Sequence, residues 1–203
     1  MSKVEVVFEE ELNYISSYPI SDFVVKCFND LVPDYFWDFS ASSSHKYHPK
    51  ISNIKHGLVL HTKLCVWWGR KIADSFGDIN TDIIVASLLL HDLQKFGQSL
   101  DENNKPTLAQ YASSHGPILA AQLENVFDGA KINDDVKRDI DTIITCVALH
   151  MGRWTNEPLS VSWREFDREE DDQLVRIVHL ADFVASKKID EKLEELNNWK
   201  MPS

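Results

Sequence analysis

Residues 82–97, DIIVASLLLHDLQKFG, constrain the fold more than any other stretch of the chain. The first part is apolar on almost every side, which is typical of a helix buried in the middle of a protein. A histidine and an aspartate, His91 and Asp92, follow this apolar run directly, with Lys95 three residues on. Because an unpaired buried charge is very costly, the segment predicts a central helix whose polar end is satisfied by a partner. A divalent metal ion is the simplest partner for an imidazole and a carboxylate.

The composition is that of a globular chain with one domain or a small pair. Of the 203 residues, 43% are hydrophobic and 26% are charged. No apolar run reaches the roughly 18 residues of a membrane-spanning helix, and the acidic start of the chain lacks the layout of a signal peptide. The three cysteines lie among apolar residues, which favours a reducing cytoplasm: Cys27, Cys65 and Cys146. We therefore expect a cytoplasmic protein without a membrane partner.

The net charge of −11 disfavours binding to duplex nucleic acid. It does not exclude a small nucleotide or a short strand, because a metal ion and one or two lysines can reverse the sign of the local charge. The chain also lacks the spacing of a zinc finger and the glycine pattern of a P-loop or a dinucleotide-binding fold.

Helical periodicity dominates the chain from Gly57 onward. It predicts an all-α bundle of about six to eight helices. In the N-terminal part, a helix is expected from Ser21-Asp22 to Pro33. Residues 4–8 could be a strand or an extended arm, and residues 34–50 read as a loop that could cover a site. We expect residues 1–54 to pack on the core as an extension, residues 55–190 to form the main domain and residues 191–203 to form an amphipathic tail.

Metal-capable side chains interrupt the apolar face of every predicted helix between residues 57 and 190. Each of them lies three or four positions from apolar residues of its stripe: His61, His91, Asp92, His115, His150 and Asp182. A single buried histidine is most often a core residue, whereas a buried aspartate is rare unless it is paired. Six such residues on consecutive helices favour one shared site in the core of the bundle.

The chemistry of these side chains narrows the ion. Imidazole nitrogen and carboxylate oxygen without thiolate suit iron, manganese, zinc, cobalt or nickel rather than calcium. Six ligands are more than one tetrahedral zinc needs, and they are enough for two ions that share a bridging carboxylate. A two-metal centre activates water and stabilises displacement at phosphorus.

The order H…HD…D, formed by His61, His91-Asp92 and Asp182, resembles the HD-domain superfamily of metal-dependent phosphohydrolases. The local contexts LLLHDLQKFG and VHLADFVAS are similar to the corresponding helices of that family, and SSHGP and ALHMG, with His115 and His150, are similar to members that hold two metals. Among these, the spacing resembles dinucleoside-polyphosphate hydrolases, and GLVLHT resembles HD-type exoribonucleases. The resemblance covers about residues 55–190 and implies a single HD-domain helical bundle with the metal site in its core.

Carried over by position, the resemblance implies that His61, His91, Asp92 and Asp182 hold the first metal. His115 and His150 would hold the second, with Asp92 bridging the two. We expect two divalent transition-metal ions, with iron or manganese ahead of zinc, cobalt or nickel.

Several further residues are candidates for a substrate site. Lys95 could bind a substrate phosphate, or it could be a solvated lysine near a helix C-terminus. His179 could orient Asp182 or donate a proton, and Arg153 and Arg70 could meet a phosphate or form surface ion pairs. His45 and His48 lie in an expected loop and are not expected to be ligands. Aromatic residues of the connections could stack a base or simply cover the core: Tyr35, Trp37, Tyr47, Trp154 and Trp163.

The pattern predicts hydrolysis of a phosphoester or phosphoanhydride in a small phosphate compound, with a nucleotide as the expected substrate class. Asp92 and Lys95 are the expected catalytic residues. A di-iron oxygenase of the HD type is one alternative, and a non-catalytic sensor domain that binds metal or nucleotide is another. The tail at residues 189–200 could make a homodimer contact.

Overall fold

The fold is described from a computed structural model. It describes residues 1–42, 48–96, 102, 114–127, 133–154, 169–187 and 199–201. These residues form α-helices and short 3-10 turns without a strand, so the prediction of an all-α protein is confirmed for the described part of the chain.

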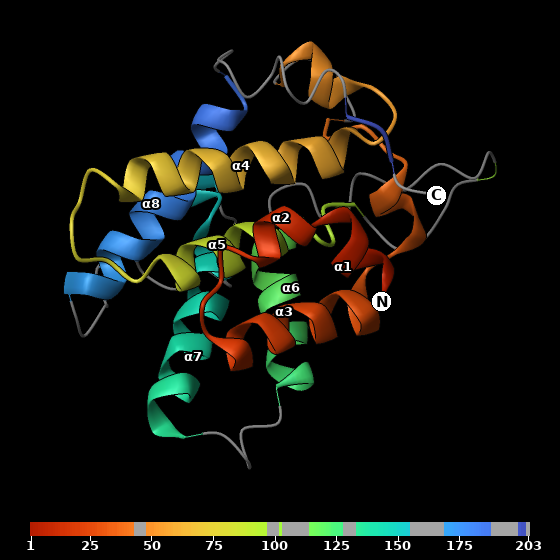
Figure 1. Ribbon diagram of the computed structural model, residues 1–203. Helices are drawn as coiled ribbons and strands as arrows, with labels where there is room; N and C mark the ends of the chain where they lie inside the picture. The colour runs from red at the N-terminus through yellow and green to blue at the C-terminus, as the bar shows by residue number, and fades with distance from the viewer. Residues whose placement is uncertain are drawn as a thin grey trace.

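The elements follow one another as a series of helices linked by turns (Figure 1). Their bounds are α1 Lys3–Val7, α2 Glu9–Leu12, α3 Tyr18–Leu31, η1 Asp34–Trp37, η2 Lys50–Asn53, α4 Gly57–Ala73, α5 Thr81–Leu90, α6 His115–Val126, α7 Asp134–Leu149, η4 Gly152–Trp154 and α8 Glu169–Ala185. Asparagine side chains cap α5 and α7. The Asn80 side chain accepts a hydrogen bond from the Asp82 N–H, and the Asn133 side chain accepts one from the Val136 N–H.

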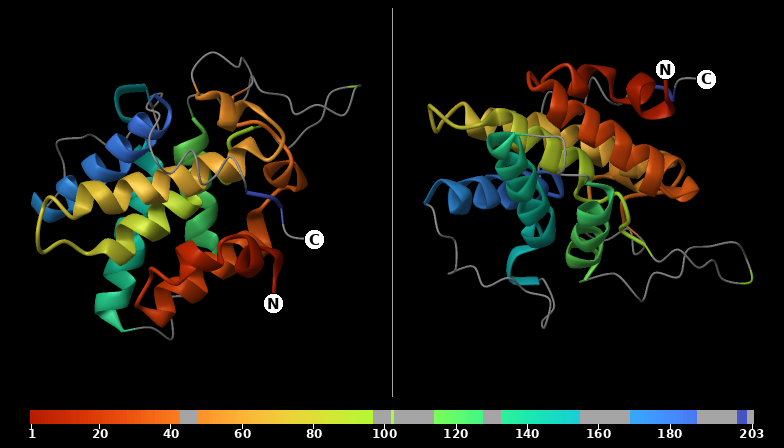
Figure 2. Two further views of the ribbon diagram at one scale, coloured as in Figure 1. Left: turned by 45° about the horizontal axis from the view of Figure 1, so that its top comes forward. Right: turned by 90° about the horizontal axis from the view of Figure 1, so that it is seen from below.

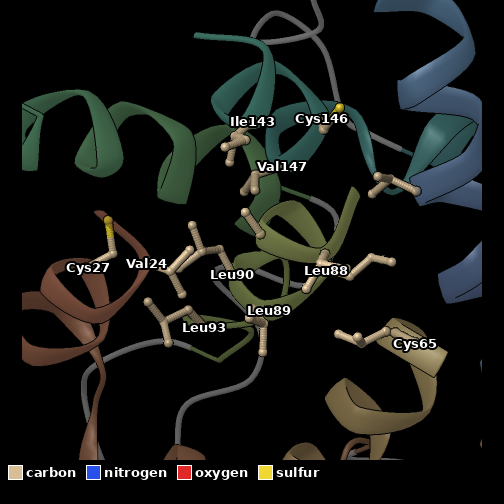
Figure 3. Close-up of a cluster of buried hydrophobic side chains, with 14 of the residues drawn as sticks. Val24, Cys27, Cys65, Leu88, Leu89, Leu90, Leu93, Ile143, Cys146 and Val147 are labelled. Atoms are coloured by element: carbon tan, nitrogen blue, oxygen red, sulfur yellow. The ribbon is translucent and has the colours of Figure 1, made fainter. Parts of the chain in front are cut away.

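The apolar helix α5 lies at the centre of the bundle, with α3, α4, α7 and α8 packed around it. All ten of its residues except Thr81 are buried. Figure 3 shows its leucines pointing to different sides, among Val24 of α3, Cys65 of α4 and Val147 of α7. A helix that contacts neighbours on all sides has no polar face, which explains why this segment is apolar all round.

Helices α4 and α5 pack closely because α4 carries a glycine at their contact. A Cβ atom on Gly69 would lie 2.3 Å from Leu88 Cδ1 and 3.0 Å from Ile84 Cγ2. Helix α8 lies against the same two helices, and Figures 1 and 2 show α4, α5 and α8 side by side. The C-terminal end of α5 is therefore enclosed by helices from distant parts of the sequence.

The N-terminal segment is helical, contrary to the strand or extended arm considered for residues 4–8. Val4 and Val7 are buried three positions apart, and a capping box between Ser2 and Glu5 starts α1. Helix α3 begins at Tyr18, earlier than predicted, because Pro19 is well suited to the first turn of a helix. The Asp82 carboxylate at the start of α5 accepts hydrogen bonds from the Ser16 N–H (3.0 Å), the Ser16 hydroxyl (2.8 Å) and the Ser17 N–H (2.8 Å), and these bonds join the N-terminal segment to α5.

The expected loop at residues 34–50 begins with a buried 3-10 turn, so the loop prediction was wrong for η1. Phe36 and Trp37 pack on Phe8 and Phe28, and the Tyr35 hydroxyl donates a hydrogen bond to the Phe96 carbonyl at 2.6 Å. Local sequence does not reveal this, because the partners of these aromatic rings lie in other helices. Tyr35 and Trp37 are core residues and do not form an exposed surface for a base.

The end of the described chain returns to α4, where the Lys63 ammonium lies 5.7 Å from the ring centroid of Trp199. The division of the chain at residues 54 and 190 stays a prediction, and the predicted amphipathic tail lies mostly outside the described residues. Among the helices that the structure describes, none is both long and apolar enough to cross a membrane.

Candidate metal centre

The six metal-capable side chains come together at the C-terminal end of α5. His61 lies on α4 and Asp182 on α8, whereas His91 and Asp92 directly follow α5. His115 is the first residue of α6, and His150 directly follows the last residue of α7. The four histidines and Asp92 are at most 1% exposed, and the side chain of Asp182 is 15% exposed.

The first group of donor atoms comes from His61, His91, Asp92 and Asp182. His61 Nε2 lies 3.0 Å from Asp182 Oδ1 and 3.5 Å from Asp92 Oδ2. His91 Nε2 lies 3.5 Å from Asp92 Oδ2 and 3.9 Å from Asp182 Oδ1. Bonds of roughly 2.0–2.2 Å to a transition metal place neighbouring ligand atoms roughly 3.0–3.5 Å apart. The donor atoms of His61, His91 and Asp182 lie close enough together to hold an ion, and Asp92 Oδ2 lies beside them.

The second group shares Asp92 with the first. Asp92 Oδ1 lies 3.0 Å from His115 Nε2 and 3.7 Å from His150 Nε2. The two imidazoles approach each other with their Nε2 atoms 2.9 Å apart. Asp92 therefore turns Oδ2 toward the first group and Oδ1 toward the second.

Gly116 allows His115 and His150 to come this close. A Cβ atom at this position would lie 2.8 Å from the Val147 carbonyl oxygen and 3.2 Å from His150 Cε1. The absence of a side chain therefore lets the start of α6 pack directly on the end of α7.

Backbone carbonyls orient two of the imidazoles toward the centre. The Nδ1 of His91 lies 2.7 Å from the Leu88 carbonyl, and the Nδ1 of His150 lies 2.7 Å from the Val147 carbonyl. A ring that donates its Nδ1–H to a carbonyl keeps the lone pair of Nε2 for a metal. The His179 ring contacts the backbone of the second group, because its Nδ1 hydrogen-bonds the His150 carbonyl at 2.7 Å.

The electrostatics of the site favour ionised carboxylates and shift the pKa values of three of its histidines in different directions. Burial alone would raise the pKa of Asp92, but the charges of Lys95 and His91 hold it well below its usual range. Burial also opposes ionisation of Asp182, and His61 outweighs it, so this pKa is lowered as well. Burial lowers the pKa of His150 to about 4, and it lowers the pKa of His61 as well. For His91, burial is the largest single effect, but Asp92 and Asp182 together outweigh it and raise the pKa.

Cys65, one turn beyond His61, lies within the same group of close donor atoms as His61, His91 and Asp182, but its sulfur does not lie where the His61 lone pair points. Its Sγ lies 3.5 Å from Nε2 and 3.8 Å from Nδ1 of His61. An atom on the lone-pair axis of Nε2 would be much farther from Nδ1 than from Nε2, so the sulfur lies beside the ring. Burial raises the pKa of this thiol, and Cys65 packs against His61 as a small neutral residue.

Of the other predicted substrate residues, Lys95 lies at the centre, whereas Arg70 and Trp154 contact aromatic residues elsewhere. The Lys95 ammonium contacts Asp92 Oδ2, next to the first donor group. Arg70 lies over the ring of Tyr14, and Trp154 is exposed and stacks on Phe183. For Arg153 only the η4 backbone is described, and Tyr47 and Trp163 lie outside the described residues; the roles of these three stay predictions.

His48 is the residue that the sequence left out of the site. It was expected in a loop that could cover a site and was not expected to be a ligand, and its ring lies 4.7 Å from the ring of His61, measured between centroids. No periodic pattern surrounds it, so the sequence has no signal for the direction in which this connection folds. His45 lies outside the described residues.

The comparison with known families agrees with this arrangement. The family model described as "HD domain" matches residues 58–186, which include all six metal-capable residues. No curated protein and no solved structure matches the chain.

Proposed function

The chain belongs to the HD-domain family, a superfamily of metal-dependent phosphohydrolases, and from this we propose that it hydrolyses a phosphoester or phosphoanhydride bond of a small phosphate compound. A nucleotide is the proposed substrate class. The observation that carries the proposal is the position of Asp92, whose two carboxylate oxygens face two separate groups of histidine and aspartate donors.

The donor set fits two divalent ions, with His61, His91, Asp92 and Asp182 as ligands of one and Asp92, His115 and His150 as ligands of the other. When bound, such ions lower the pKa of a coordinated water toward 7 and offset negative charge on a phosphoryl group. All donors are nitrogen or oxygen atoms, which suits iron and manganese. We assign the metal positions to these residues and propose iron or manganese as the ions.

The side chains of the site have complementary tasks. Asp92 and Asp182 stay ionised at neutral pH because the surrounding cations and hydrogen bonds lower their pKa values. Lys95 keeps its proton, because Asp92 and Asp182 outweigh burial and raise its pKa. The Lys95 ammonium contacts Asp92 Oδ2, which we assign as a ligand of the first metal. Lys95 is therefore placed to bind an oxygen of the phosphoryl group and to stabilise the charge on that group.

The proposal is tested by loading the purified protein with Mn²⁺ or Fe²⁺ and assaying phosphate release. Suitable substrates are nucleotides, dinucleoside polyphosphates, cyclic nucleotides and short RNA. Asp92→Ala should lose both bound metal and hydrolysis, because the bridging ligand is removed. Asp78→Ala, which changes an exposed aspartate in the turn before α5, should keep both.

Full hydrolysis by Asp92→Ala would contradict the assigned site. A wild-type protein that binds metal but releases no phosphate from any substrate would contradict the proposed activity. Oxygen consumption by the iron-loaded protein would instead favour the di-iron oxygenase alternative.

A further inference from the structure

His48 lies beside the metal centre in a fixed position. Its ring meets the ring of His61 edge to face, with an interplanar angle of 79°. The Asn53 side chain donates a hydrogen bond to the His48 carbonyl at 2.9 Å, and the Ser52 N–H donates one to the Pro49 carbonyl at 3.0 Å. The η2 turn thus anchors the backbone on the C-terminal side of His48.

Both ring nitrogens of His48 are buried and have no hydrogen-bond partner among the described residues. Buried polar groups in native proteins are nearly always hydrogen-bonded. An imidazole held against a candidate metal ligand with two unpaired nitrogens therefore indicates a partner that binds at this position.

The surroundings of His48 indicate the chemistry of that partner. The groups that act on it electrostatically are His61, Lys95, Asp92 and Asp182. An imidazole carries at least one N–H donor whether it is neutral or protonated. Bound metal ions and the Lys95 ammonium would make this region attractive to an anion.

His48 does not belong to either donor group. Among the described residues, neither the donor atoms close to His61, His91 and Asp182 nor those close to Asp92, His115 and His150 include a nitrogen of His48. His48 also precedes the part of the chain that matches the family. Its nitrogens are therefore available to a molecule bound at the centre and are not needed to complete the donor groups.

We propose that His48 donates a hydrogen bond to a phosphate oxygen of the substrate, on the side of the centre formed by the N-terminal segment. This inference rests on the proposed function, because it takes a phosphate group as the ligand. His48 would act together with Lys95, with the two residues binding phosphate oxygens from different segments of the chain.

The test is a titration of the Mn²⁺-loaded protein with inorganic phosphate by calorimetry, together with the metal content of each variant. His48→Phe keeps a flat ring and removes both nitrogens, whereas His48→Asn keeps a donor. His48→Phe should weaken phosphate binding roughly tenfold, as expected for the loss of a hydrogen bond to a charged group, with unchanged metal content. His48→Asn should stay within about threefold of the wild type.

His56→Asn is the matched control. The His56 Nδ1 already hydrogen-bonds the Trp37 carbonyl at 2.6 Å, and its backbone has a φ of 65°, which asparagine tolerates. This variant should bind phosphate like the wild type.

Equal phosphate affinity in His48→Phe and the wild type would overturn the inference, and so would a loss of metal in His48→Phe or a wild type that binds no phosphate. These outcomes differ from a failure of the proposed function, which would appear as phosphate binding that depends on His48 without hydrolysis of any substrate.

Discussion

The two oxygens of Asp92 face two different groups of donors, and a single substitution should impair metal binding by one group and not by the other. His115→Ala removes a donor from the second group only, since His115 Nε2 lies 3.0 Å from Asp92 Oδ1 and takes no part in the first group. If the centre holds two ions as proposed, the variant should bind about one.

Metal content per chain, measured by elemental analysis of dialysed protein, checks this prediction. Asp182→Ala is the matched variant for the first group and should lose the other ion. Loss of both ions from His115→Ala would show that the two positions cannot be filled independently.

The histidines of the centre should make the metal-free protein less stable in mild acid. Burial lowers the pKa of His150 to about 4 and that of His48 to about 2, whereas the unfolded chain takes up these protons near pH 6.5. The unfolded state then binds more protons below pH 6.5, and the free energy of unfolding falls by up to about 1.4 kcal/mol per pH unit for each such histidine.

His91 works in the opposite direction because its pKa is raised: its contribution is complete below pH 6.5 and is lost as the pH rises through its folded pKa. The histidines with lowered pKa values outnumber it, so the net change is a loss. Urea unfolding of chelator-treated protein at pH 7 and pH 5 measures the effect. A stability that stays constant or rises toward pH 5 would contradict the assigned pKa shifts, and His150→Gln should reduce the pH dependence.

Among the elements, the contact of α6 with α7 positions the second donor group. Gly116→Ala places a Cβ atom against the Val147 carbonyl and the His150 ring, so α6 must move away from α7. We expect the second metal to be bound at least tenfold more weakly, because displacement of ligands by a fraction of an ångström spoils the geometry of the site.

A metal titration with a competing chelator checks this prediction. Ala121→Ser, at an exposed position of the same helix, is the control and should bind metal like the wild type. Unchanged affinity for both ions in Gly116→Ala would show that α6 can shift without moving His115.

At the scale of the whole molecule, a buried ion pair joins the N-terminal segment to the main bundle. Lys63 of α4 and Glu11 of α2 are 5% and 3% exposed in their side chains, and their charged atoms lie 2.6 Å apart. The Lys63 ammonium also lies 5.1 Å from the ring centroid of Phe8. Glu11→Ala should lower the free energy of unfolding by roughly 3–5 kcal/mol, because it leaves a buried ammonium without its counter-ion.

Chemical denaturation of Glu11→Ala measures this loss. The double variant Glu11→Leu/Lys63→Met removes both charges and should recover most of the stability. A single variant as stable as the wild type would show that water reaches Lys63 and replaces the lost partner.

The amino-acid sequence by itself determines the helices and which of their faces are buried. Helical periodicity is a local property, so the apolar stripes identify α4, α5, α6, α7 and α8, and they also place His61, Asp92 and Asp182 on the inward faces. The all-round apolar character of residues 83–90 likewise indicates the central helix before any contact is known.

The tertiary structure decides which of these inward residues meet and through which atoms. His61 and Asp182 lie 121 positions apart in sequence and 3.0 Å apart in space, and no local pattern encodes that distance. Local patterns also do not encode the directions in which the two Asp92 oxygens point, the core position of Trp37 or the contact of His48 with His61. These features depend on how separate segments pack, and packing is set by contacts across the whole chain, which local periodicity does not contain.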